Sequence, residues 1–235
     1  MFRFIAANLS PITPIRSTLA MMSAISHVCV RRGVLKQQFD VARQMSTIEE
    51  TCIPSYLHPN LAAAGVAWAR LFAAARLHRR FAPVGPVLDF GAALGELAHI
   101  LPPESRYDFV EIDEVMARLL LEGNPKAERY VLDDLKSEQY TAIFALDSLE
   151  HNDDVGAILD RLCLALHPDG VLILSGPTEN ALYRLGRRIA GFNGAYHKTT
   201  IYDIERKVGH RFRLVSRRAL PIGIPLFSVS CWYLK

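Results

Sequence analysis

Hydrophobic residues occur in short runs along residues 87–235, and longer stretches with helical spacing separate these runs. Apolar runs bounded by glycine, proline or charged residues predict strands at 87–90, 107–111, 129–132, 141–146, 170–175, 211–217 and 226–234. Apolar positions three to four residues apart predict helices at 95–101, 113–121, 153–166, 178–190 and 200–208. Such alternation is typical of an α/β fold with a doubly wound, mostly parallel sheet of these seven strands. Pro221, Gly223 and Pro225 separate the last two strands, which favours a closing antiparallel hairpin.

A further helix is predicted over residues 60–80, before the first strand. Its apolar residues recur at helical spacing, namely Leu61, Ala64, Trp68, Leu71 and Ala75. Basic residues crowd its second half, namely Arg70, Arg76, Arg79 and Arg80. Either this helix packs on the sheet as a lid, or its basic face contacts anionic lipid.

Residues 1–54 differ in composition from the rest of the chain, with six basic residues before position 49 set against Asp40 alone. Leu19–Val30 is a modestly apolar stretch behind basic residues, but it has no clear cleavage pattern. We therefore divide the chain into an N-terminal extension, 1–54, and a folded domain, 55–235. The extension is expected to be poorly ordered, to act in targeting or to contact a membrane surface.

A glycine-containing turn follows the first strand, in the sequence VLDFGAALGELA at 87–98. Asp89 closes the apolar run, and Gly91 and Gly95 bracket a turn in which side chains would obstruct a ligand. Free backbone N–H groups at the start of the following helix are expected to form a cradle for a nucleotide-like ligand. Steric demands of a strand-to-helix turn are the competing explanation of the glycines.

The second strand ends at Glu111, about twenty residues after Gly91, where a dinucleotide-type fold places a carboxylate that binds ribose hydroxyls. With this residue, the order of motifs resembles that of class I S-adenosylmethionine-dependent methyltransferases, whose first motif runs acidic-x-Gly-x-Gly-x-Gly. The chain matches at Asp89, Gly91 and Gly95 and departs at Ala93, where the family has its middle glycine. The resemblance implies a Rossmann-like fold and S-adenosylmethionine as the cofactor.

The resemblance also implies which residues bind this cofactor, at the ends of successive strands. They are Asp89, Gly91, Ala92, Gly95, Glu111, Ile112, Asp133, Asp134 and Asp147. By the same resemblance Asp133 would meet the adenine amino group. Helix capping is the alternative role for these two acids, and it suits Asp134 better than Asp133.

The fourth strand runs into Asp147, Glu150 and His151, which share one face of a helical turn. Two carboxylates and an imidazole suit Mg²⁺, Mn²⁺ or Zn²⁺. The pattern resembles the acidic-x-x-Glu-His motif of metal-dependent O-methyltransferases of quinone biosynthesis and small-RNA methylation, with Asp147 in place of the usual Glu. Metal-free relatives also carry Glu-His here, so both a metal site and a metal-free site remain open.

The loop at 191–200 lies where the resembled family builds its acceptor pocket. His197 is the candidate there for a general base or a fourth metal ligand. Together with Glu150 and His151 it forms the predicted catalytic group. The preceding helix carries Arg184, with further arginines at 187 and 188, and these serve either as a solvated face or for an anionic or lipid-linked substrate.

Composition narrows the setting. A net charge of +3 is too small to indicate nucleic acid. The cysteines, at 29, 52, 163 and 231, show no C-x-x-C spacing, which favours a reducing compartment such as the cytoplasm. The basic helices leave association of a cytoplasmic protein with a membrane surface open. No apolar run reaches the roughly 20 residues that a membrane-spanning helix needs.

The function that the resemblance implies is methyl transfer from S-adenosylmethionine to an oxygen or carbon of a small or lipid-like acceptor. Two hypotheses from other classes remain. A catalytically silent S-adenosylmethionine-binding module is suggested by Ala93. A nicotinamide-dependent oxidoreductase requires a G-x-G-x-x-G spacing that Gly91, Ala93 and Leu94 do not supply.

Overall fold

The structure is a computed structural model that describes residues 14–48, 51–184, 199–221 and 223–235. The chain forms two compact units, Met1–Gln44 and Met45–Lys235, so the division falls earlier than the predicted one at residue 54. In the first unit, residues expected to be poorly ordered form a helix, α1 (Pro14–Gln38). Over the described residues, no helix combines the length and the apolar character needed to span a membrane.

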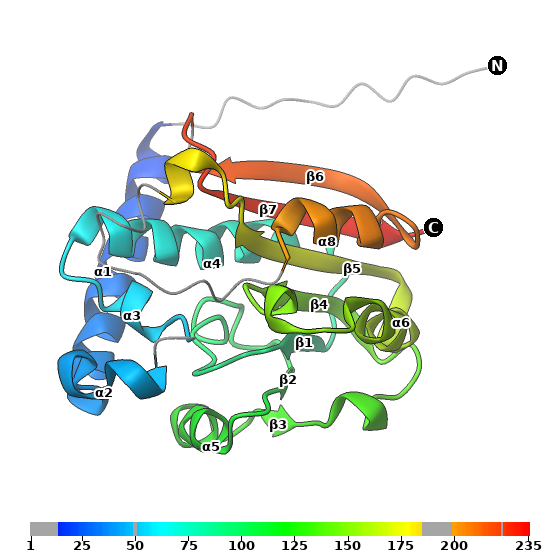
Figure 1. Ribbon diagram of the computed structural model, residues 1–235, viewed down its shortest axis with the longest axis horizontal. Coiled ribbons are helices and arrows are strands. Elements are labelled where there is room, and N and C mark those ends of the chain that lie inside the picture. The colour runs from blue at the N-terminus through cyan, green and yellow to red at the C-terminus, as the bar shows by residue number, and fades with distance from the viewer. Residues whose placement is uncertain (1–13, 49–50, 185–198, 222) are drawn as a thin grey trace. The chain divides into compact units, whose positions relative to one another are not determined.

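The second unit is built on a seven-stranded sheet of order β3-β2-β1-β4-β5-β7-β6, with β3 at one edge and β6 at the other (Figure 1). Its strands are β1 (Val87–Phe90), β2 (Tyr107–Val110), β3 (Glu128–Arg129), β4 (Tyr140–Leu146), β5 (Leu166–Pro177), β6 (Phe212–Leu220) and β7 (Phe227–Leu234). The first five are parallel, and β7 runs antiparallel between β5 and β6. The predicted Rossmann-like sheet and its closing hairpin are confirmed.

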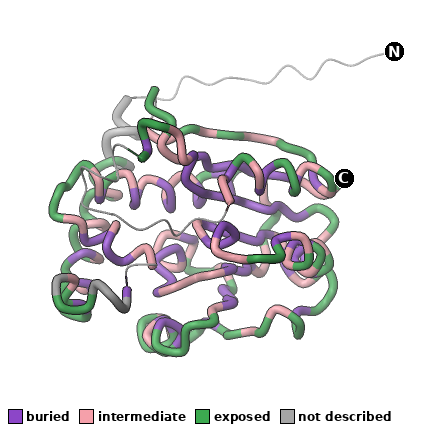
Figure 2. The backbone as a smooth tube through the Cα atoms, in the orientation of Figure 1, coloured by how far each residue is buried: buried purple, intermediate pink, exposed green. Residues whose placement is uncertain are grey.

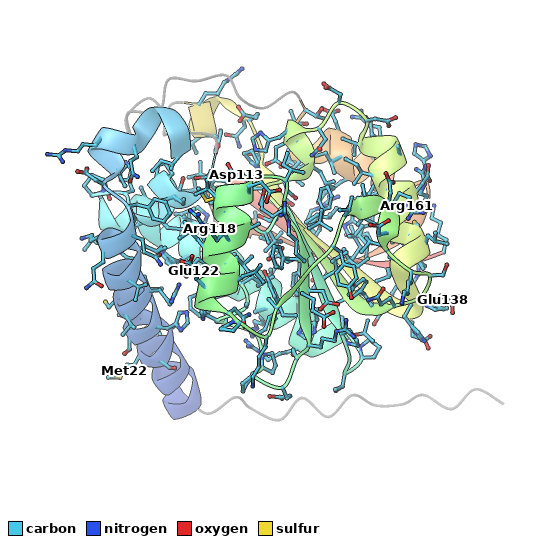
Figure 3. The ribbon with its side chains drawn as sticks, turned by 90° about the horizontal axis from the view of Figure 1, so that it is seen from below. Met22, Asp113, Arg118, Glu122, Glu138 and Arg161 are labelled. Atoms are coloured by element: carbon cyan, nitrogen blue, oxygen red, sulfur yellow. The ribbon has the colours of Figure 1, made fainter. Side chains whose placement is uncertain are left out.

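Helices and 3-10 turns connect the strands. They are α2 (Val41–Ile48), α3 (Ile53–Tyr56), α4 (Leu61–Phe81), α5 (Glu114–Gly123), η1 (Leu132–Asp134), η2 (Leu149–His151), α6 (Val155–Ala165) and α8 (Ile201–Val208). Side chains fix several starting points: Asn60 accepts from the N–H groups of Ala62 and Ala63 at the start of α4, and Asp113 does the same for α5. In Figure 3, Asp113 and Arg118 mark α5 on one side of the sheet, and Arg161 marks α6 on the other.

The central strands are buried on both faces, because helices cover the sheet on both sides. Every residue of β1 and β2 is buried, and so is most of β4 and β5, whereas β3 and much of β6 are exposed (Figure 2). Val87, Leu88, Ile143, Phe144 and Leu172 have no exposed surface. Adjacent β1 and β4 are in register from Val87↔Ala142 to Phe90↔Ala145, so their carboxyl ends meet at one point of the sheet edge.

Three predicted elements differ in the structure. Residues 95–101 form hydrogen-bonded turns and not a helix, because Gly95 has a positive φ of +68° and Pro102 follows within two turns. β5 runs from Leu166 to Pro177 and so extends beyond the predicted strand 170–175 at both ends, and its pairing with β4 shifts between Tyr140 and Ala142. Of the predicted helix 178–190, residues 181–184 are helical, and residues 185–190 lie outside the described residues.

Candidate functional site

The carboxyl ends of β1 and β4 border a pocket within the second unit. Its floor is the turn after β1, and residues of α3 and α4 close its other side. The lining residues are Cys52, Ile53, Tyr56, Leu71, Asp89, Gly91, Ala92, Ala93, Leu94, Glu96, Leu97 and Leu146. Ligands of open α/β sheets bind at this position, where connections leave neighbouring strands in opposite directions.

The glycine turn has an unusual backbone. Gly91 and Gly95 have φ values of +72° and +68°, and Ala93 has +48°. Because only glycine adopts such values without strain, Ala93 carries a cost of roughly 1–2 kcal/mol. A negative φ at Ala93 would have avoided that cost, and the structure does not have one.

Four backbone N–H groups of this turn are already bonded within the protein, those of Gly91, Ala92, Ala93 and Gly95. Gly91 and Ala92 both donate to Val110 O, at 2.8 and 3.4 Å, and Gly95 donates to Ala92 O at 2.9 Å. No helix begins here, so no helix N-terminus is available to bind a phosphate. The turn therefore suits a ligand that packs against it more than an anion that it would bind.

Close packing explains both glycines. A Cβ on Gly91 would lie 2.4 Å from Ser148 Cβ, directly after β4, and one on Gly95 would lie 2.7 Å from Leu120 Cγ of α5. Such separations are too short for carbon atoms. The glycine turn is thus held between the turn after β4 and helix α5.

Glu111, the predicted ribose ligand, contacts the same turn. Its Oε2 accepts the Ala93 N–H at 2.7 Å, and its Oε1 accepts the Asp113 N–H at 2.9 Å. The backbone carbonyl of Glu111 accepts from Arg129. The carboxylate is therefore placed beside the turn, at the end of β2, as the sequence predicted.

Apolar side chains next to Glu111 are exposed. Ile112 is 90% exposed and Val131, after β3, is 64% exposed, while Leu132 is half-buried. Large apolar residues at the ends of two neighbouring strands form a surface that a planar ring can cover.

Asp133 and Asp134 lie on η1 and are both exposed. The Asp133 carboxylate is 3.7 Å from Arg161 of α6, and the same guanidinium donates to the Asp133 carbonyl. Neither acid caps the helical turn, which lacks a side-chain cap. The alternative capping role is therefore wrong for Asp134, and Asp133 is held beside α6.

Asp89 lies at the base of the pocket and is 4% exposed. The Tyr107 hydroxyl donates to its Oδ2 at 2.6 Å. Burial raises the Asp89 pKa to about 7, the hydrogen bond from Tyr107 opposes that rise, and the Glu111 charge adds to it. Asp89 thus binds a proton in a pH range where an exposed aspartate does not.

The wall opposite Asp89 comes from α3 and α4. Tyr56 stacks near Trp68 with ring centroids 4.8 Å apart, and the Trp68 indole N–H donates to Tyr56 O at 3.4 Å. Cys52 lines the pocket, and its pKa is raised to about 12, first by burial and then by the Asp147 charge. Its thiol is therefore protonated and unreactive at neutral pH.

Asp147 follows β4 and forms an ion pair with Arg70 of α4. Arg70 is 5% exposed, its guanidinium lies 4.2 Å from the centroid of the Phe227 ring, and Asp147 has a φ of +54°.

The sequence grouped Arg70 with the other arginines in the second half of this helix. In the structure Arg70 is buried, whereas Arg76, Arg79 and Arg80 are exposed. The sequence held one sign of this burial: Arg70 lies on the same side of the helix as the apolar residues Ala67 and Leu71, which are both buried.

Several oxygen atoms near this ion pair are buried and have no hydrogen-bond partner among the residues that the structure describes. They are Asp147 Oδ1, Ser148 Oγ, Ser175 Oγ and both carboxylate oxygens of Glu150. Glu150 is 1% exposed, and burial followed by the nearby Asp147 charge raises its pKa well above the usual value. Buried polar atoms without a hydrogen bond are energetically costly, so a ligand that forms hydrogen bonds with these oxygens would be stabilised here.

The predicted metal group does not assemble. Across the described parts of the chain, no three His, Cys, Asp or Glu residues are placed to hold a metal ion, so Asp147, Glu150 and His151 are not such a set. The positive charge beside Asp147 belongs to Arg70 instead. His197 lies outside the described residues.

Comparison with known proteins gives the family. A family model described as a methyltransferase domain matches residues 66–220. This range includes the glycine turn, Glu111 and the turn after β4. None of the curated proteins matches the chain.

Solved structures share the fold at low sequence identity. The PH0226 protein of Pyrococcus horikoshii is 15% identical, with a TM-score of 0.62 over 77% of this chain and 96% of that one. Magnesium protoporphyrin IX methyltransferase from Synechocystis, solved with bound SAH, is 16% identical, with a TM-score of 0.58 over 75% and 88%. The N-methyltransferase NodS of Bradyrhizobium japonicum, in complex with S-adenosyl-L-homocysteine, is 14% identical, with a TM-score of 0.59 over 72% and 87%.

Proposed function

The chain belongs to the methyltransferase domain family, and from that premise we propose that it transfers the methyl group of S-adenosylmethionine to an oxygen or carbon of a small or lipid-like acceptor. The observation that carries the proposal is that Asp147, Ser148 and Glu150, after β4, hold buried oxygens with no hydrogen-bond partner among the described residues, and that Ser148 packs against Gly91 of the glycine turn. Family membership replaces the two other hypotheses, the catalytically silent module and the nicotinamide oxidoreductase.

The residues around the pocket suit S-adenosylmethionine in three respects. Glu111 offers carboxylate oxygens at the end of β2, where ribose hydroxyls would bind. Exposed Ile112 and half-buried Leu132 offer apolar contact to the adenine ring. Asp89, with Gly91, Ala92 and Gly95, would adjoin the methionine portion, and Asp133 is available to the adenine amino group.

S-adenosylmethionine supplies an electrophilic methyl on a sulfonium, and the acceptor displaces it in line. The S–CH₃ bond breaks as the new O–CH₃ or C–CH₃ bond forms, the sulfur leaves as a neutral thioether, and the acceptor loses a proton. The chain's own task is to orient the two reactants and to accept that proton.

Glu150 is the residue that we assign to the acceptor. Both its oxygens are buried and have no hydrogen-bond partner in the described parts of the chain, so a hydroxyl group of the acceptor can donate to the carboxyl group and satisfy an otherwise costly group. His151, half-buried on the same turn, and His197 are the accompanying candidates for proton transfer. A hydroxyl acceptor fits this arrangement directly, and an acidic carbon needs the same proton removal.

We further propose an acceptor class and a membrane contact. The Asp147-x-x-Glu150-His151 pattern favours a quinone-like acceptor, and the exposed Arg76, Arg79 and Arg80 offer a basic surface to a membrane that holds lipid-like molecules. Both agree with a protein of the cytoplasm that associates with membranes at its surface.

The test begins with calorimetry of S-adenosylhomocysteine binding to the purified protein. Radiolabelled S-adenosylmethionine is then incubated with the protein and with lipid and aqueous fractions of cell extract, supplied separately. We expect saturable binding and label in a product of the lipid fraction. Absence of binding would refute the cofactor assignment, and label confined to protein or nucleic acid would refute the acceptor class.

A further inference from the structure

We infer that Arg70 is the built-in cation of this site: its guanidinium takes the place beside Asp147 that a divalent ion would need, and it positions the turn after β4 against the glycine turn. This inference rests on the proposed function for its consequence in methyl transfer. The ion pair itself is a property of the protein without ligand. Arg70 is a positioning residue in this role, since it acts through Asp147.

The buried charge of Asp147 requires a cation beside it. Asp147 and Glu150 are three residues apart, and the charge of Asp147 raises the Glu150 pKa, so the two carboxyl groups are close enough to repel. Asp147 is held by the Arg70 Nη1 in a region where both side chains are largely removed from water, with 5% and 12% of their side-chain surface exposed. A guanidinium is always protonated and presents only donors, so it neutralises Asp147 without needing any further ligand.

The guanidinium is fixed on several sides. Its Nε lies 3.4 Å from Ala67 O of the same helix. Its Cζ lies 4.2 Å from the centroid of the Phe227 ring, at the start of β7. Phe227 in turn meets Tyr183 edge-on, with centroids 5.3 Å apart. Arg70 thus joins α4, the turn after β4 and the start of β7, and it has little freedom to leave Asp147.

The ion pair reaches the glycine turn through two neighbouring residues. Asp147 has a left-handed φ of +54°, and its N–H donates to Ser175 O at 2.8 Å. Ser148 follows directly, and its Cβ would lie only 2.4 Å from a Cβ on Gly91. A change in the position of Asp147 therefore moves Ser148 against the turn that lines the cofactor pocket.

A divalent ion that binds both Asp147 oxygens would have to displace the guanidinium, and an ion that binds Oδ1 alone would lie beside its positive charge. That displacement leaves a buried arginine without its partner, which is strongly unfavourable. The described residues also offer no third His, Cys, Asp or Glu ligand to compensate. The acidic-x-x-Glu-His pattern is thus present in the sequence, but the structure places an arginine where the metal-dependent proteins need the ion.

The experiment compares four proteins by thermal unfolding with and without Mn²⁺, and by calorimetry with S-adenosylhomocysteine. They are the wild type, Arg70→Met, the double variant Arg70→Met with Asp147→Asn, and Arg76→Met as an exposed arginine of the same helix. Arg70→Met keeps the apolar stem and removes the charge. The double variant removes both charges together.

We expect Mn²⁺ and EDTA to leave the wild type and Arg76→Met unchanged in melting temperature and in S-adenosylhomocysteine affinity. Arg70→Met should bind S-adenosylhomocysteine about tenfold more weakly or worse. Its melting temperature should rise with Mn²⁺, because Asp147 and Glu150 are then free to share the ion. The double variant should show no response to Mn²⁺.

Two results would overturn the inference: a wild type that Mn²⁺ stabilises as much as it stabilises Arg70→Met, or an Arg70→Met protein that binds like the wild type and ignores Mn²⁺. If Arg70→Met does not fold, Arg70→Lys replaces it and must be insensitive to Mn²⁺ while binding S-adenosylhomocysteine more weakly. A Mn²⁺ response of Arg70→Lys contradicts the inference. If the wild type binds no S-adenosylhomocysteine, the proposed function fails, whereas the Mn²⁺ comparison still decides the role of Arg70.

Discussion

The backbone N–H of Ala93 donates to the Glu111 carboxylate at 2.7 Å, which ties the turn after β1 to the end of β2. The second carboxylate oxygen accepts from Asp113 N–H. Glu111 therefore braces the glycine turn in the protein without ligand. The residue that sequence analysis assigned to ribose binding also shapes the pocket in which the rest of the ligand would lie.

Replacing Glu111 should consequently weaken S-adenosylhomocysteine binding. In Glu111→Ala both the charge-assisted hydrogen bonds to ribose and the brace on Ala93 are lost, so we expect a decrease of roughly 1–3 kcal/mol. Calorimetry measures the change. Glu104→Ala, at an exposed position of a neighbouring loop, is the control and should bind as the wild type does. Equal affinities of Glu111→Ala and Glu104→Ala would contradict the assignment.

The contact between Gly91 and Ser148 gives a second prediction. In Gly91→Ala the new methyl would lie 2.4 Å from Ser148 Cβ at a backbone φ of +72°, so overpacking and backbone strain should together lower the free energy of unfolding by roughly 2–4 kcal/mol. Denaturant unfolding measures this change.

Gly123→Ala is the matched control for that substitution. A Cβ on Gly123, at the end of α5, meets nothing within 4 Å. Its free energy of unfolding should stay within about 1 kcal/mol of the wild type. Similar losses in both variants would show that the Ser148 contact does not determine the effect.

Sequence patterns predicted the sheet well because most residues of the buried strands are apolar, as Leu88 and Ile143 are. They predicted Glu111 at a strand end for the same reason. The absence of the helix predicted at 95–101 was harder to predict from the sequence, because the apolar spacing there also suits a series of turns. The positive φ of Gly95 is visible only in the structure. Arg70 was misread, since a buried arginine is recognised by its partner, Asp147, 77 positions later in the chain.

The remaining arginines of α4 give a prediction on membranes. Arg76, Arg79 and Arg80 are exposed, and α4 contains no acidic residue. If this face contacts lipid, co-sedimentation with anionic vesicles should decrease as salt rises, because each basic residue near the surface contributes about 1 kcal/mol. Arg79→Gln with Arg80→Gln should reduce the bound fraction more than Arg118→Gln, an exposed arginine of α5. Equal retention by both variants would assign α4 to packing alone.

The buried Asp89 gives a prediction on pH. The Asp89 pKa is about 7 in the folded protein, against 3.8 for an aspartate exposed to water as in the unfolded chain, and burial is the main cause of the difference. Between these values the folded protein binds a proton that the unfolded chain has lost, so stability from this group is complete below pH 3.8 and falls as pH rises to about 7. The total loss is about 4 kcal/mol, from roughly three pKa units at about 1.4 kcal/mol each.

Asp89→Asn should remove this loss, because an amide carries no charge at any pH and its oxygen can still accept from the Tyr107 hydroxyl. The difference in the free energy of unfolding between Asp89→Asn and the wild type, measured by denaturant at several pH values, should therefore grow in favour of the variant from pH 4 to pH 7 and then level off. Tyr107→Phe tests the cause. Loss of the hydroxyl removes the one contact that lowers the Asp89 pKa, so the decline in stability should extend to higher pH than in the wild type. A stability difference between Asp89→Asn and the wild type that does not change with pH would mean that Asp89 is already ionised in the folded protein.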